Sequence, residues 1–139
     1  MTGRVLIADS DSDFRLKLYK RLLDGDVFSD IVGDGREAIE RLINADYAVV
    51  VLDLTLPFGG GERILDAIME QPRPRRPIVL VVAPPGSARS LDIEAVQIVL
   101  RRPCNLQQLA EIVQSCVRIA TAEPLSVPDV VAETDQPAA

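Results

Sequence analysis

The hydrophobic and polar positions along the chain alternate between short apolar runs and longer amphipathic stretches. Five runs rich in Val and Ile predict β-strands, and they lie at residues 5–8, 27–32, 48–52, 78–83 and 96–100. Between and after them, apolar side chains recur at the spacing of amphipathic helices. These stripes are Phe14, Leu18 and Leu22; Ala38, Ile39, Leu42 and Ile43; Ile64, Leu65, Ile68 and Met69; and Leu106, Leu109, Ile112, Val113, Cys116, Val117 and Ala120. A further short helix is expected at about residues 88–95, after the Pro84-Pro85-Gly86 turn.

This alternation predicts an α/β fold, a doubly wound (βα)5 three-layer sandwich of the flavodoxin-like type. The runs at 5–8, 48–52 and 78–83 contain no polar residue, as expected of parallel strands that are buried on both faces. The run at 27–32 contains Ser29 and Asp30, and the run at 96–100 contains Gln97, so these two strands suit the edges of the sheet. Right-handed crossovers then favour the strand order 2-1-3-4-5.

The ends of the pattern predict the domain boundary. Gly25 is placed to end the first helix, and Asn105 is placed to cap the start of the last one. The apolar periodicity stops after Ala120, so residues 1–122 are expected to form one domain. Residues 123–139 contain three prolines, four acidic residues and no basic residue, which predicts a flexible acidic tail.

Composition narrows the classes of partner. The formal net charge of −6 argues against nucleic acid or an anionic membrane as the main partner. No apolar run approaches the roughly 20 residues of a membrane span, and the N-terminus lacks the pattern of a signal peptide. With no His and no CxxC motif, Cys104 and Cys116 indicate neither a zinc site nor a redox site. We therefore expect a cytoplasmic protein.

Carboxylates gather where the predicted strands end. Asp9 ends the first strand and Asp53 the third, and the predicted order places these strands side by side at the point where winding reverses. Asp11 and Asp13 add negative charge nearby. Clustered carboxylates either have raised pKa values or hold a hard cation. In the alternative interpretation, Asp9, Asp11 and Asp13 only cap and charge the start of the first helix.

Four motifs resemble those of response-regulator receiver domains of two-component signal transduction, in the order that the family has them. Residues 5–15 resemble the first strand and the acidic loop, and Asp34-Gly35-Arg36-Glu37-Ala38 matches the DG-x-x-A opening of the second helix. Residues 51–57 match the phosphoacceptor strand and loop, with Gly61 in the place of the usual glycine. Arg102-Pro103 matches the Lys-Pro pair after the fifth strand. The resemblance covers residues 4–121.

The resemblance implies a signalling module that is not an enzyme. Asp53 would accept a phosphoryl group from a histidine kinase or phosphotransfer protein, and the domain would then act on a downstream protein partner. Mg²⁺ would be held by Asp9, Asp53 and the backbone carbonyl of Thr55, with Ser10 as a weak substitute for a further acidic ligand. Arg102 and Ala83 would contact the phosphoryl group.

Departures from the family pattern indicate an atypical receiver. Ser10 stands where the family has a second acidic residue, and Val82 where it has the hydroxyl that follows the phosphoryl group. Val99 stands near the position of the aromatic switch residue, and Arg102 replaces a lysine. A second hypothesis is therefore an interaction module that works without phosphorylation. A hydrolase with an Asp nucleophile is disfavoured, because the DxDxT signature lacks its second acid after Asp53.

Overall fold

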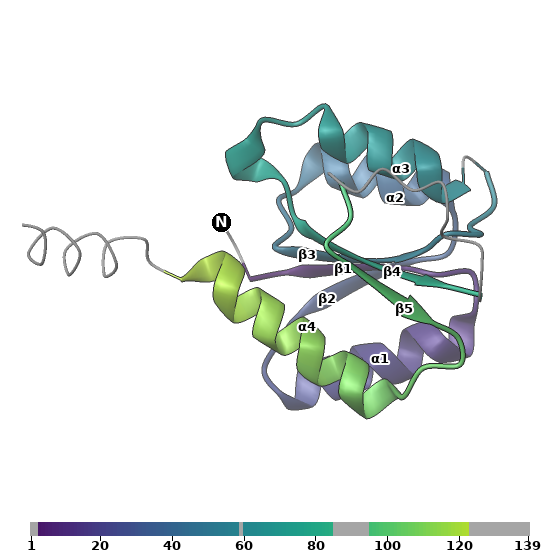
Figure 1. Cartoon of the computed structure of the whole chain (residues 1–139), viewed down its shortest axis with the longest axis vertical. Coiled ribbons are helices and arrows are strands. Elements are labelled where there is room, and N and C mark those ends of the chain that lie inside the picture. The colour runs from purple at the N-terminus through teal and green to yellow at the C-terminus, as the bar shows by residue number, and fades with distance from the viewer. Residues whose placement is uncertain (1–2, 59, 85–94, 123–139) are drawn as a thin grey trace, which may run out of the picture.

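The computed structural model describes residues 3–58, 60–84 and 95–122, and these form one parallel sheet between two helical layers (Figure 1). The strands are β1 (Val5–Ala8), β2 (Ser29–Val32), β3 (Val49–Asp53), β4 (Ile78–Ala83) and β5 (Ile98–Arg101). Their order is β2-β1-β3-β4-β5, and every neighbouring pair is parallel. The predicted fold class and strand order are confirmed.

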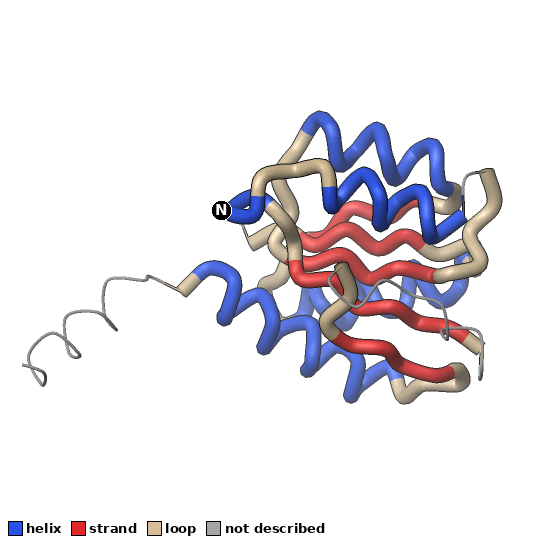
Figure 2. Tube along the Cα trace, turned by 45° about the horizontal axis from the view of Figure 1, so that its top comes forward, coloured by secondary structure: helices blue, strands red, loops and turns tan. Residues whose placement is uncertain are grey.

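The helices of the described residues flank this sheet. They are α1 (Ser12–Asp24), α2 (Gly35–Asn44), α3 (Gly60–Met69) and α4 (Leu106–Thr121), with a 3-10 turn η1 (Arg73–Arg75) before β4. Figure 2 shows α2 and α3 on one face and α1 and α4 on the other. Most of the short helix predicted at 88–95 lies outside the described residues, as does the tail predicted at 123–139.

Each face of the sheet has its own apolar core, because successive side chains of a strand point to opposite faces. On β4, for example, Val81 packs beneath α2 and α3, whereas Val82 packs beneath α1 and α4. All residues of β1 and β3 are buried, while the edge strand β5 alternates between half-buried and exposed side chains. None of the described helices has both the length and the apolar character needed to cross a membrane.

The bounds of β1 and β4 are as predicted, whereas those of β2, β3 and β5 differ from the predicted ones by one or two residues. β2 begins at Ser29 and not at Val27. The Val27 N–H donates a hydrogen bond to the Leu22 carbonyl at the end of α1, so it does not pair with a neighbouring strand. β5 begins at Ile98, after Gln97, whose side-chain oxygen accepts a hydrogen bond from the Val79 N–H at 2.6 Å. The two predicted helix ends are confirmed: Gly25 is the C-cap of α1 and Asn105 the N-cap of α4.

The start of α2 touches the loop that follows β3. Asp34 is the N-cap of this helix, and its side chain accepts a hydrogen bond from the Glu37 N–H at 2.9 Å. The Gly35 N–H donates to the Pro57 carbonyl at 2.9 Å. A Cβ at Gly35 would lie only 2.5 Å from the Phe58 carbonyl oxygen. The Asp-Gly pair therefore combines a helix cap with a residue small enough for this backbone contact.

Candidate functional site

Asp9 and Asp53 lie side by side at the carboxyl edge of the sheet. The β1–β3 register pairs Ala8 with Leu52, which places the two following aspartates next to each other. Both are almost fully buried, with relative exposures of 1% and 2%. The predicted juxtaposition is confirmed, and it creates a pair of carboxylates at the switch point of the sheet.

Each oxygen of the Asp53 carboxylate accepts two hydrogen bonds. Oδ1 accepts from the Thr55 N–H at 2.9 Å and from the Thr55 hydroxyl at 2.7 Å. Oδ2 accepts from the Ser10 N–H at 3.3 Å and from the Ser10 hydroxyl at 3.1 Å. Burial acts to raise the pKa of Asp53, but these hydrogen bonds outweigh it and leave the pKa below its usual value. Asp53 is therefore an ionised, oriented carboxylate at neutral pH.

Asp9 has a different environment. Its Oδ1 accepts a hydrogen bond from the Asp11 N–H at 2.9 Å, and its Oδ2 is bonded to the guanidinium of Arg102. Burial raises the pKa of Asp9 above its usual value, and the contributions of Asp11 and Arg102, which lower the pKa, do not cancel this effect. Sequence reasoning missed Arg15, whose guanidinium donates to the Asp9 backbone carbonyl at 2.7 Å. Its place one helical turn after Asp11 was the available signal.

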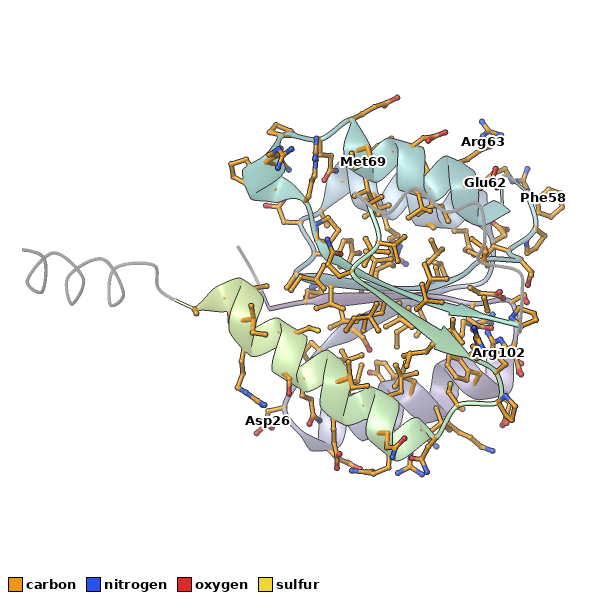
Figure 3. The ribbon with its side chains drawn as sticks, in the orientation of Figure 1. Asp26, Phe58, Glu62, Arg63, Met69 and Arg102 are labelled. Atoms are coloured by element: carbon orange, nitrogen blue, oxygen red, sulfur yellow. The ribbon has the colours of Figure 1, made fainter. Side chains whose placement is uncertain are left out.

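Arg102 brings positive charge to the carboxylate pair. Its Nη2 atom contacts Asp9 and lies 3.9 Å from the Asp53 Oδ2 atom. The guanidinium also lies over the Phe14 ring, 5.0 Å from its centroid. The backbone N–H of Arg102 donates a hydrogen bond to the Ala83 carbonyl at 3.0 Å. This bond holds the start of the loop after β5 against the end of β4. Figure 3 shows Arg102 near the end of β5, on the same side of the molecule as Phe58.

The acidic residues after β1 have two different roles: some cap the first helix, and one belongs to the buried carboxylate site. Asp11 is the N-cap of α1 and accepts hydrogen bonds from the Asp13 and Phe14 N–H groups. Asp13 lies in the first turn and pairs with Lys17 at 3.0 Å. These two residues cap and charge the helix, whereas Asp9 belongs to the buried site.

The chain is similar to known proteins in sequence and in fold. No protein-family model matches the chain. The regulatory protein LuxO of Vibrio cholerae is 32% identical over 107 residues, an alignment that covers 75% of this chain and 23% of LuxO. The chain thus spans about a quarter of this relative's length.

Solved structures with the same architecture include two from Vibrio. The signal receiver domain of a protein proposed to be a LuxO repressor, from Vibrio parahaemolyticus, has a TM-score of 0.75 and 24% identity, with 94% of this chain and 98% of that chain covered. The chemotaxis response regulator CheY4 of Vibrio cholerae has a TM-score of 0.74 and 21% identity, with coverage of 84% and 99%. The chain has the fold of a response-regulator receiver domain.

A third receiver-type structure contains a metal. The response regulator TrrA of Thermotoga maritima, solved in complex with Mg²⁺-BeF, has a TM-score of 0.71 and 21% identity, with 83% of this chain and 99% of that chain covered. In the described part of the present chain, no group of three or more His, Cys, Asp or Glu side chains is placed to hold a metal. The buried carboxylates at this position are Asp9 and Asp53 alone among the described residues.

Val82 and Val99, two positions that depart from the receiver pattern, have different surroundings. Val82 is fully buried in the apolar cluster beneath α1 and α4, next to Asp53 in the β3–β4 register. Val99 is 44% exposed on the edge strand. A valine has neither a hydroxyl that could donate a hydrogen bond nor an aromatic ring.

Gly61 lies where α3 meets the site. A Cβ at this position would lie 3.0 Å from the Leu54 Cα atom, and the Gly61 N–H donates to the Leu54 carbonyl at 3.3 Å. Gly60 has a positive φ of 64° at the first residue of the helix. Gly61 therefore lets the helix approach the backbone that directly follows Asp53, while Gly60 supplies the left-handed backbone conformation at the start of the helix.

Proposed function

We propose that this chain is a phosphorelay receiver that accepts a phosphoryl group on Asp53 and signals by protein–protein interaction. The observation that supports this best is Asp53 itself: an ionised carboxylate at the carboxyl end of β3, oriented by Ser10 and Thr55, with a guanidinium 3.9 Å away. The donor would be a histidine kinase or a phosphotransfer protein in the cytoplasm. In this role the chain is a signalling module rather than an enzyme, and its net charge of −6 fits protein rather than nucleic acid as the partner.

The transfer has simple chemistry. An oxygen of the Asp53 carboxylate attacks phosphorus, the bond from phosphorus to the donor atom breaks, and the bonding electrons leave with the donor. Ser10 and Thr55 hold the carboxylate so that little reorientation is needed before attack. Arg102 would pair with the phosphoryl oxygens, and the backbone of Ala83 would contact the same group at the end of β4.

The donor set fits a weakly held Mg²⁺. Asp9, Asp53 and the Thr55 carbonyl would hold the ion with oxygen ligands, which are the ones that Mg²⁺ prefers. When bound, the metal would neutralise charge between carboxylates and phosphoryl oxygens. Ser10 lowers the negative charge of these ligands, because it stands where a third carboxylate would bind the cation. Its hydroxyl is neutral and donates a hydrogen bond to Asp53.

A phosphorylation-independent interaction module is the second candidate. Val82 and Val99 favour it, since both stand at positions where the family couples phosphorylation to a change of surface. The two candidates share the fold and the partner class. They differ in whether Asp53 takes up phosphate at all.

Exposure of the chain to a small phosphodonor decides between them. With acetyl phosphate and Mg²⁺, the intact mass is expected to rise by one phosphoryl group, and peptide mapping is expected to place that group on Asp53. Omitting Mg²⁺ is the control. An unchanged mass at every donor concentration would favour the interaction module.

Ser10→Asp is expected to tighten Mg²⁺ binding by roughly 1–2 kcal/mol. The substitution adds one negative charge beside Asp53, and the estimate assumes an effective dielectric constant near 20 with partial loss to desolvation. Ser10→Asn is the matched control, because it has the size of Asp without its charge. Isothermal titration of both variants and the wild type measures the effect. Equal Mg²⁺ affinity in all three proteins would contradict the assigned role of Ser10.

A further inference from the structure

We propose that Phe14 is a positioning residue for Arg102, because its ring holds the planar guanidinium where it can pair with a phosphoryl group on Asp53. The inference rests on the proposed function, since it takes Arg102 as the side chain that contacts this group. The helical stripe of the sequence explained Phe14 only as a core residue. The structure gives it a second contact, through which it acts on the site.

The Arg102 side chain has to keep one orientation to reach both carboxylates. Its Nη2 atom contacts Asp9 and lies 3.9 Å from the Asp53 Oδ2 atom, so a turn of the guanidinium changes both contacts. The side chain is partly exposed and adjoins an open pocket of about 450 Å³. This pocket is lined by Phe14, Arg102, Pro103, Cys104 and Leu106. A long side chain beside such a space has several rotamers open to it, and restricting it to one costs entropy.

Phe14 is a fixed wall of this pocket. It lies in the first turn of α1 and is buried in the apolar cluster beneath α1 and α4. Its N–H donates a hydrogen bond to the N-cap residue Asp11 at 3.3 Å, which fixes its backbone. The Arg102 guanidinium lies over the ring, with its Cζ atom 5.0 Å from the ring centroid. A cation at this distance from a ring face is attracted to it, so the ring favours the orientation that brings Nη2 to the carboxylates.

This arrangement suits an arginine better than a lysine. A guanidinium is planar and weakly hydrated, so it can lie on a ring and still donate hydrogen bonds from its edge. An ammonium is a compact, strongly hydrated charge with no flat face. Arg102 therefore faces Phe14 and Asp9 with the same group. A lysine at this position would gain less from the ring, so the effect of Phe14 on phosphorylation is expected to depend on the residue at position 102.

A double-mutant cycle of phosphorylation rates tests the proposal. With acetyl phosphate and Mg²⁺, Phe14→Leu is expected to slow phosphorylation of the chain about fivefold, because the ring contact is lost. Phe14→Tyr keeps the ring and is expected to stay within about twofold of the wild type. In the Arg102→Lys background, Phe14→Leu is expected to change the rate by less than about twofold. Equal slowing in both backgrounds overturns the proposal, as does a wild-type rate for Phe14→Leu.

Leu106→Ala is the matched control for the packing of the pocket. Leu106 is a partly buried apolar wall of the same pocket, but it has no ring. The variant is expected to keep the phosphorylation rate within about twofold of the wild type. A loss equal to that of Phe14→Leu would assign the effect to packing and would overturn the role of the ring.

A second measurement follows the resting chain without a phosphodonor. In a nitrogen–proton NMR spectrum, the ring current of Phe14 is expected to shift the Arg102 side-chain Nε–H proton upfield of that of the exposed Arg63. This shift is expected to disappear in Phe14→Leu. The wild-type spectrum suffices if that variant does not fold, because an Arg102 signal at the position of Arg63 overturns the proposal. If the wild type takes up no phosphate, the proposed function fails, and the NMR shift alone then decides whether the ring holds the guanidinium.

Discussion

Asp53→Asn is expected to abolish phosphorylation of the chain and to lower its free energy of unfolding by about 1–2 kcal/mol. The first effect follows because an amide oxygen is not a nucleophile toward phosphorus in this setting. The second follows from hydrogen bonding: one backbone N–H donates to each carboxylate oxygen, from Thr55 at 2.9 Å and from Ser10 at 3.3 Å. Asparagine has a single oxygen, so one of these buried donors would face an NH2 group. Relief of repulsion with Asp9 offsets part of this loss.

Asp11→Asn is the control for both effects. Asp11 is exposed at the start of α1, and asparagine caps a helix about as well as aspartate does. Intact mass after acetyl phosphate treatment and urea unfolding measure the two consequences. Wild-type phosphorylation of Asp53→Asn would show that another residue is the acceptor. Wild-type stability would show that the hydrogen bonds of Asp53 are replaced without loss.

Gly35→Ala is expected to destabilise the domain by about 2–3 kcal/mol. The added Cβ would lie 2.5 Å from the Phe58 carbonyl oxygen and 3.3 Å from the Pro57 carbonyl oxygen. Both atoms are backbone, so the loop between β3 and α3 has to move as a unit, and the hydrogen bond from the Gly35 N–H to Pro57 is lost or lengthened. Since this loop follows Asp53 and Thr55, its movement also reaches the proposed phosphoacceptor site.

Gly33→Ala provides the comparison, because it lies two residues away and adds the same methyl group. Its Cβ would meet the end of the Arg15 side chain, which can turn aside. Thermal unfolding of the two variants is expected to show a clear fall in midpoint for Gly35→Ala and a small one for Gly33→Ala. Equal midpoints would mean that the loop yields without strain.

The strand order was predictable because polarity along the strands reports their place in the sheet. β1, β3 and β4 are apolar on both faces, whereas Ser29, Asp30 and Gln97 mark the two edges. The ends of strands were less predictable. The Gln97 side chain accepts a hydrogen bond from β4, and the Val27 N–H donates one to the end of α1. Hydrophobic periodicity does not indicate either hydrogen bond.

The candidate site was predictable in its positions but not in its pairing. The ends of adjacent strands determine that Asp9 and Asp53 meet, whatever their surroundings. The partner of Arg102 depends on the reach of a flexible side chain between two carboxylates, and the resemblance pointed to the phosphoryl group rather than to Asp9. The paired hydrogen bonds of Ser10 and Thr55 to Asp53 likewise depend on local loop geometry.

The buried position of Val82 bears on how reversibly a phosphorylation switch can be lost during evolution. Val82 is fully buried in the apolar cluster beneath α1 and α4. Its methyl groups therefore stabilise the folded protein whether or not Asp53 is modified. A threonine in its place would bury a hydroxyl whose best acceptor, a phosphoryl oxygen, is present only while Asp53 is modified. In the proposed receiver, a change from threonine to valine at position 82 would therefore remove a switch residue and gain stability. The reverse change would lose stability first, and it would gain a function only when a phosphodonor is present. This asymmetry favours retention of the fold after the switch has gone.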